Sequence, residues 1–385
     1  MFAVSYAILV LIAALPLTLT ILRERSNPRS LAFAHRIYRD LAYIALAVIA
    51  IIVLETIFRI ALQNYWFGEL GQQYRYWFAL GLQIAIFAAV FIFGGLFIAL
   101  NLWLACRPVA IVPSSAPWVV GFILSAAVAF GATSLWTPLM ALLGAAPSGV
   151  TDPVFGKDLS FYLLALPLYE GVIHLVISVL VVTIVACAGI GFLFYPRLAG
   201  PWRHHSRYPI LVGDRSPSEK EAEDAHFFVD RRSAWEGWVR QAMVLGVLLC
   251  LSFGLARFLG RYHLVIGGHS SVVAGASFVD IQFWLPAYAV IIADWGAAAV
   301  GFTAAVCLPS LRRWLFAAPS HWATPACLFA AVYLGAATIP TAVEHLYVGP
   351  NQITLEQPYL VRSIAGTRRA YGLDGPDVEE QEFAV

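Results

Sequence analysis

One acidic residue, Asp294, lies inside a long apolar stretch, where its type and position could support ion or proton movement. It is about ten residues into the apolar run 285–308, so a membrane-crossing helix would place it near the middle of the bilayer. An ionised carboxylate there costs roughly 2.5–3.5 kcal/mol on insertion scales, and acids inside membrane helices are typical of ion or proton paths. The alternative is a protonated or hydrogen-bonded Asp294 that packs two helices together.

Two pairs of ionisable residues have a spacing of four, which brings side chains together on one face of a helix. Glu55 and Arg59 lie near the outer end of the apolar run 41–62. They could form a gating pair, but we expect a neutralising pair that reaches toward the membrane surface. Glu170 and His174 could bind a metal or move a proton, although two ligands are too few for a metal site.

Other acids and histidines are scattered over segments that we place outside the membrane. A membrane-embedded transferase would need clustered acids for metal or base chemistry, and the available ones are Glu69, Asp152 and Asp158. The stretch 267–271 (GGHSS) lacks the lysine of a phosphate-binding loop and is expected to be a flexible turn. Four residues could converge on a metal although their spacing matches no metal motif: His263, His269, Asp280 and His345. We therefore expect no catalytic residue, metal site or cofactor, and we expect that the protein is not an enzyme.

The composition indicates an integral membrane protein. Hydrophobic residues make up 60% of the chain and charged residues 12%, with a mean hydropathy of +0.76, whereas soluble domains contain roughly 25% charged residues. No basic patch interleaved with aromatic residues suggests nucleic-acid binding. The five cysteines form no C-x-x-C pair, so disulfides and zinc sites are not expected.

The apolar runs predict an all-α bundle of about eight transmembrane helices with interfacial segments. The runs are 1–22, 41–62, 77–104, 118–143, 168–194, 242–259, 285–308 and 322–343. The central polar loop 195–240 contains eight Lys/Arg and is expected in the cytoplasm, because positively charged loops stay inside. The resulting layout places sixteen Lys/Arg in inside loops and five in outside loops, which fits the same rule.

This layout divides the chain into a transmembrane domain, 1–343, and an extracytoplasmic tail, 344–385. Within the tail, Pro358 suits the start of a helix and Gly372 suits its end. Tyr359, Ile364 and Tyr371 can share an apolar face of this helix. The remaining residues are acidic and are expected to be unpacked.

Four stretches carry a resemblance to a known family. They are 65–71 (YWFGELG), 155–162 (FGKDLSFY), 275–280 (GASFVD) and, between 350 and 374, the segments PNQ, EQPYL and TRRAYGLD. In order and spacing they resemble uncharacterised protein family 0182, from about residue 36 to the C-terminus. The resemblance implies a multi-pass cell-membrane protein with a large extracytoplasmic domain after the last helix. The run 1–22 would be additional to the family pattern, and the large domain would be missing or truncated here.

The expected function is that of an envelope scaffold or assembly component, whose bundle anchors and orients extracytoplasmic parts or partner subunits. One alternative is a transporter or channel with Asp294 on its path, and another is a membrane-embedded transferase. The expected partners are the lipid bilayer and either further copies of the chain or other envelope proteins. The expected location is the bacterial cell membrane.

Overall fold

The computed structural model describes residues 31–107, 113–194, 231–270, 273, 275–315 and 317–373. These residues form helices and loops without a β-strand, which confirms the all-α class. The chain divides into two compact units, 1–82 and 83–385, and helix α3 (Gln73–Cys106) crosses the boundary between them. The expected first helix, most of the central polar loop and the acidic end of the tail lie outside the described residues.

The described part of the first unit is a helical hairpin. Helix α2 (Leu31–Glu69) is 39 residues long and contains the expected run 41–62. A tight turn then leads into α3, with Gly71 at φ 66°, a conformation that glycine adopts readily. The indole of Trp77 donates a hydrogen bond to Asn64 Oδ1 over 2.9 Å. The aromatic segment 64–76 therefore forms the two helix ends and the turn between them.

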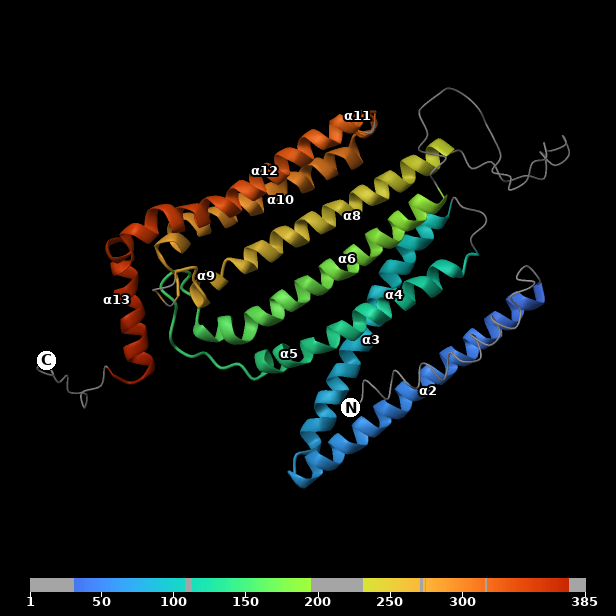
Figure 1. Cartoon of the computed structure of the whole chain (residues 1–385), viewed down its shortest axis with the longest axis horizontal. Coiled ribbons are helices and arrows are strands. Elements are labelled where there is room, and N and C mark those ends of the chain that lie inside the picture. Colours follow the sequence, from blue (N-terminus) through green and yellow to red (C-terminus); the bar gives the residue numbers. More distant parts are fainter. Residues whose placement is uncertain are drawn as a thin grey trace, which may run out of the picture. The chain divides into compact units, whose positions relative to one another are not determined.

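The second unit contains the rest of α3 and the remaining elements. In chain order these are α4 (Ala116–Ala132), η1 (Thr133–Leu135), α5 (Trp136–Leu143), η2 (Phe161–Ala165), α6 (Leu166–Phe194), α8 (Arg231–Gly260), α9 (His263–Ile266), η3 (Asp280–Trp284), α10 (Leu285–Cys307), α11 (Pro309–Leu315), α12 (Pro319–Val343), η4 (Glu344–Val348), η5 (Gly349–Asn351) and α13 (Gln352–Ala370). Helix α6 packs against α4 and α8, and α10 packs against α8 and α12 (Figure 1).

Six stretches of the described residues are helical, long and apolar enough to cross a membrane. They are Gln73–Cys106, Ala116–Leu143, Phe161–Gly191, Glu236–Ile266, Asp280–Cys307 and Ser320–Ala370. Each contains or overlaps one of the expected runs from 77–104 onward, so six of the eight predicted helices are confirmed. Of the other two runs, 41–62 lies within α2 and 1–22 lies outside the described residues.

Small residues explain how α3 and α4 approach each other closely. A methyl group on Gly121 would come within 2.7 Å of the backbone of Ala99, and one on Gly95 would come within 2.5 Å of Phe122. Helices that gain little from the hydrophobic effect in lipid associate through such close contacts. A polar contact joins α3 to α8, because the Gln241 amide donates hydrogen bonds to the backbone and side-chain oxygens of Asn101 over 2.8 and 3.0 Å.

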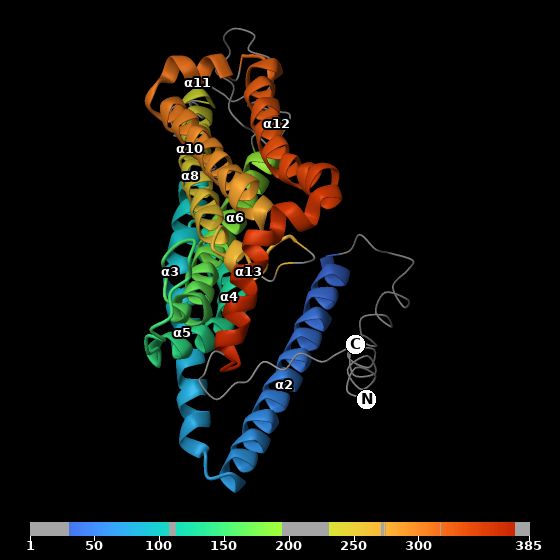
Figure 2. The same cartoon turned by 90° about the vertical axis from the view of Figure 1, so that its left-hand side faces the viewer.

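Three short π-helical segments of the described chain, η2, η3 and η4, lie at one end of this unit. The first two precede α6 and α10, the third follows α12, and α9 and α13 lie at the same end (Figure 1). We call it the α13 end; it faces the viewer in Figure 2. Because π-helical turns are frequent at functional sites, the α13 end is where a site is sought.

Candidate functional site at the α13 end

The loop before η2 is organised by two aspartates. Asp152 is 5% exposed and accepts hydrogen bonds from the Tyr162 hydroxyl at 2.6 Å and from the backbone amides of Val154, Phe155 and Lys157. Burial raises the pKa of Asp152, but these hydrogen bonds together outweigh it, so that the pKa lies below its usual value.

Asp158 fixes the other side of the same loop. Its carboxylate accepts hydrogen bonds from the Ser148 hydroxyl and from the amides of Ser148, Gly149 and Ser160. Hydrogen bonds from Ser160 are the largest cause of its lowered pKa, followed by those from Ser148. Both aspartates therefore hold the loop's backbone in place, and Glu69 lies at the end of α2 in the other unit. This arrangement gives no support to the transferase hypothesis.

Aromatic rings attach this loop to the end of α8. Phe155 and Phe161 contact Tyr262 edge-on, with ring centroids 4.9 and 5.1 Å apart. The guanidinium of Arg261 lies over the ring of Phe258 at 3.9 Å, and its Nε is buried without a hydrogen-bond partner among the described residues. The stretch 155–162 thus packs against the residues that directly follow α8.

The loop 267–280 contains a histidine–aspartate pair. Asp280 is fully buried; it accepts hydrogen bonds from the His269 ring Nδ1 at 2.7 Å and from the Ser277 hydroxyl and amide at 2.7 and 2.9 Å. The His269 ring stacks on Trp284, with centroids 4.3 Å apart. Gly268 permits this packing, because a methyl group there would meet the Gly275 carbonyl oxygen at 1.9 Å. Within the stretch 267–271, which was expected to be a flexible turn, Gly268 is therefore closely packed against Gly275.

Helix α13 is attached to the same loop through Glu356. This residue is 2% exposed, and its Oε2 accepts a hydrogen bond from the amide of Phe278 over 3.2 Å. The rings of Phe278 and Tyr359 also meet, 6.3 Å apart. Two of the four stretches that carry the family resemblance, 275–280 and 350–374, are thus in direct contact.

The ionisable residues singled out from the sequence take different positions. Arg59 and Glu55 form an ion pair of 2.6 Å on α2, with the Arg59 side chain 69% exposed, as expected for a neutralising pair. Glu170 pairs with His263 at 2.6 Å rather than with His174, whose side chain is exposed. The spacing of four correctly placed both residues on α6, but the contact is made between α6 and α9.

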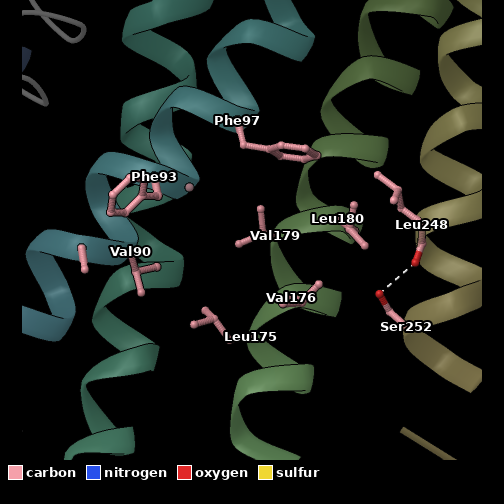
Figure 3. A pocket seen from close by; sticks show the side chains of 11 residues that line it. Val90, Phe93, Phe97, Leu175, Val176, Val179, Leu180, Leu248 and Ser252 are labelled. Atoms are coloured by element: carbon pink, nitrogen blue, oxygen red, sulfur yellow. Dashed lines mark hydrogen bonds between the residues drawn. The ribbon is translucent and has the colours of Figure 1, made fainter. Parts of the chain in front are cut away.

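Asp294 lies half-buried in α10, and its Oδ2 has no hydrogen-bond partner among the described residues. The neighbouring Trp295 stacks on Phe253 and meets Phe329 edge-on, both with centroids 4.8 Å apart. A groove of about 410 Å³ lies between α3, α6 and α8, but it is lined by other residues, including Phe93, Val179 and Leu248 (Figure 3). Its one polar side chain, Ser252, bonds back to the Leu248 carbonyl. This apolar groove does not give Asp294 a polar path.

Of the four residues that could have converged on a metal, the structure brings His269 and Asp280 into contact. In the described parts of the chain, no three His, Cys, Asp or Glu side chains are arranged to hold a metal ion. Sequence reasoning missed the role of Glu356, whose partner Phe278 is 78 residues away. It also missed the contacts of Asp280 with His269 and Ser277 in the same loop. Gly268 and Gly275 were the signal that could have indicated close packing within this loop.

Comparison with known proteins places these motifs in one family. The model of the uncharacterised protein family UPF0182 matches residues 41–385, a range that includes all four stretches described above. The chain belongs to this family. No solved structure matches the chain.

Three UPF0182 relatives illustrate the extent of the match. A protein of Moorella thermoacetica is 31% identical over 250 residues, which is 65% of this chain and 23% of the relative. Proteins of Synechococcus sp. (strain JA-3-3Ab) and Bradyrhizobium diazoefficiens are each 26% identical, over 90% and 87% of this chain and 38% and 36% of the relatives. The chain thus spans about a quarter to two-fifths of the length of these UPF0182 proteins.

Proposed function

We propose that this UPF0182 chain is a membrane anchor whose α13 end serves as a platform for an extracytoplasmic protein layer. In this arrangement the chain lies in the bacterial cell membrane with the central loop 195–240 in the cytoplasm. The α13 end then faces outward, because Arg312 and Arg313 lie in α11 at the opposite end of α10 and basic segments stay inside.

The observation that carries this proposal is the exposed apolar stripe on α13. Four residues at helical spacing are exposed on this helix or directly after it: Ile353 (89%), Val361 (61%), Ile364 (50%) and Tyr371 (78%). Glu356, on the same helix, is instead buried against the bundle. A helix that is fixed by one side and apolar on another is suited to bind a protein partner.

The lengths of the relatives support a protein rather than a lipid as the occupant of this stripe. The matched residues make up at most 38% of the three relatives described above, so most of each relative lies outside the match. In these relatives the matched part therefore accompanies a much longer chain. A platform at the end of the bundle is suited to hold that additional part or an equivalent partner protein.

Cross-linking from the stripe tests the platform. A photoreactive benzoylphenylalanine at Ile364 or Val361 of the full chain, in its own membrane, is expected to form an adduct with an extracytoplasmic protein that mass spectrometry identifies. Gly366 is also exposed but lies away from the stripe and is the matched control. Adducts with lipid alone, or equal adducts from Gly366, would overturn the proposal. An adduct between two copies of the chain would show that the stripe mediates self-assembly and would overturn the platform proposal.

The side of the membrane is tested independently. Reporter tags inserted beside Lys220 and after Leu373 are expected to be cytoplasmic and extracytoplasmic, respectively. A tag at Lys220 that is reactive from outside the intact cell would reverse the layout and remove the platform with it.

A further inference from the structure

Two carboxylates at the α13 end each have a buried oxygen that no described residue satisfies. Glu356 Oε1 and Glu344 Oε2 are both buried and have no hydrogen-bond partner among the described residues. Glu356 as a whole is 2% exposed, and its other oxygen accepts the Phe278 amide. Buried polar atoms are almost always paired, so each of these oxygens points to a partner other than the described residues.

The electrostatic surroundings indicate the charge of that partner. Glu356 lies within electrostatic reach of Glu344 and Asp280, and Glu344 also lies within reach of His269 and His345. Among the groups that act on these carboxylates, only the two histidines can carry positive charge, and the His269 ring already bonds to Asp280. Three carboxyl groups are thus gathered with little compensating charge. Buried carboxylates are stable only when they are protonated, paired with a cation or bound to a metal.

We propose that Glu344 and Glu356 bind a hard divalent cation, Ca²⁺ or Mg²⁺, between η4 and α13. Carboxylate oxygens select these ions, which complete their coordination with water and backbone carbonyl groups. A zinc-like site is excluded for the described residues, since it needs three or four converging protein ligands and no such group is present there. Asp280 does not coordinate in this proposal, because hydrogen bonds already engage both of its oxygens.

The ion would join elements that meet only at this end. Glu344 begins η4 directly after α12, whereas Glu356 lies in α13 and bonds to the loop before η3. One bound cation would therefore fix α13 to both neighbours and reduce the repulsion between the carboxylates. This inference does not depend on the platform function, because a cation-fixed α13 is compatible with any partner or with none.

Thermal unfolding of the purified full chain in detergent, after removal of metal ions with EDTA, tests the proposal. At about a hundredfold excess over Kd, Ca²⁺ or Mg²⁺ should raise the unfolding temperature by about 3 °C, whereas Na⁺ at equal ionic strength should not. Glu344→Gln and Glu356→Gln should abolish this shift without lowering the unfolding temperature of the ion-free protein, since each removes a buried, unpaired charge. Glu170→Gln is the matched control, because Glu170 lies at the same end and is paired with His263.

Equilibrium dialysis with radioactive Ca²⁺, and with Mg²⁺ as competitor, provides the direct measurement and distinguishes the two ions. We expect one bound ion per chain in the wild type and in Glu170→Gln, and at least tenfold weaker binding in either glutamine variant of the proposed site. No binding in the wild type would show that the two carboxyl groups are protonated instead and would overturn the proposal. Binding that persists in both Glu344→Gln and Glu356→Gln would also overturn it.

Discussion

Two aspartates in the same stretch, Asp280–Cys307, which is long and apolar enough to cross a membrane, have opposite surroundings. Asp280, at the α13 end, is fully buried and accepts hydrogen bonds from the backbone and side chains of His269 and Ser277. Asp294, further along α10, keeps one buried oxygen without a partner among the described residues. The helix ends and loops at the α13 end have backbone amides available, whereas the amides inside a helix are already bonded. The carboxylate at the α13 end therefore organises the hydrogen bonds around it, whereas the carboxylate inside α10 is an isolated polar group.

The largest effect is expected for Asp280→Asn, which tests whether the α13 end depends on this one carboxylate. The amide has a single acceptor oxygen, so at least one of the donors from His269 and Ser277 loses its partner in a fully buried site. We expect the free energy of unfolding to fall by about 3 kcal/mol, measured by chemical or thermal unfolding of the purified chain. Glu55→Gln, on the exposed pair of α2, is the control and should change stability little. Equal stability of both variants would contradict the comparison.

Gly268→Ala is expected to have the next largest effect. The added methyl group would lie 1.9 Å from the Gly275 carbonyl oxygen and 2.6 Å from Asp280 Oδ2, so the loop must open. We expect a loss of about 2 kcal/mol, together with faster amide hydrogen exchange in 267–280. Gly267→Ala is an unusually close control, because a methyl group at that neighbouring position meets no atom within 4 Å. If both variants behave alike, the packed loop described here is wrong.

Tyr162→Phe tests the same comparison, because its effect on the free energy of unfolding should depend on pH. Loss of the hydroxyl removes the 2.6 Å hydrogen bond to Asp152 and should cost about 1.5–2 kcal/mol at neutral pH. The pKa of Asp152 is lowered in the folded state, so its contribution is complete above the unfolded pKa of about 4 and is lost as pH falls through the folded value. The difference between wild type and variant should therefore shrink below about pH 4. Tyr169→Phe, at an exposed ring of α6, should show no such difference at any pH.

The long apolar helices could be predicted from the sequence, and the contacts of the site could not. A long apolar run becomes a helix in lipid whatever its neighbours are, since its backbone must satisfy its own hydrogen bonds. Side-chain partners depend instead on how distant segments meet. Glu170 and His174 have helical spacing, yet Glu170 bonds to His263, 93 residues away. Glu356 and Phe278 are separated by 78 residues, and no local pattern connects them.

Asp294→Asn is expected to have the smallest effect on stability and separates an anchor from a transporter. The substitution removes the charge of a half-buried carboxyl group but no hydrogen bond that the structure shows to Oδ2, so stability should change by less than about 1 kcal/mol. For an anchor, growth and membrane insertion should be unaffected. If Asp294→Asn folds normally but abolishes growth or ion flux, the isolated aspartate carries the function and the α13 end does not. Acids inside membrane helices are typical of ion paths. In that case the polar network at the α13 end would serve only to hold the helices around that path.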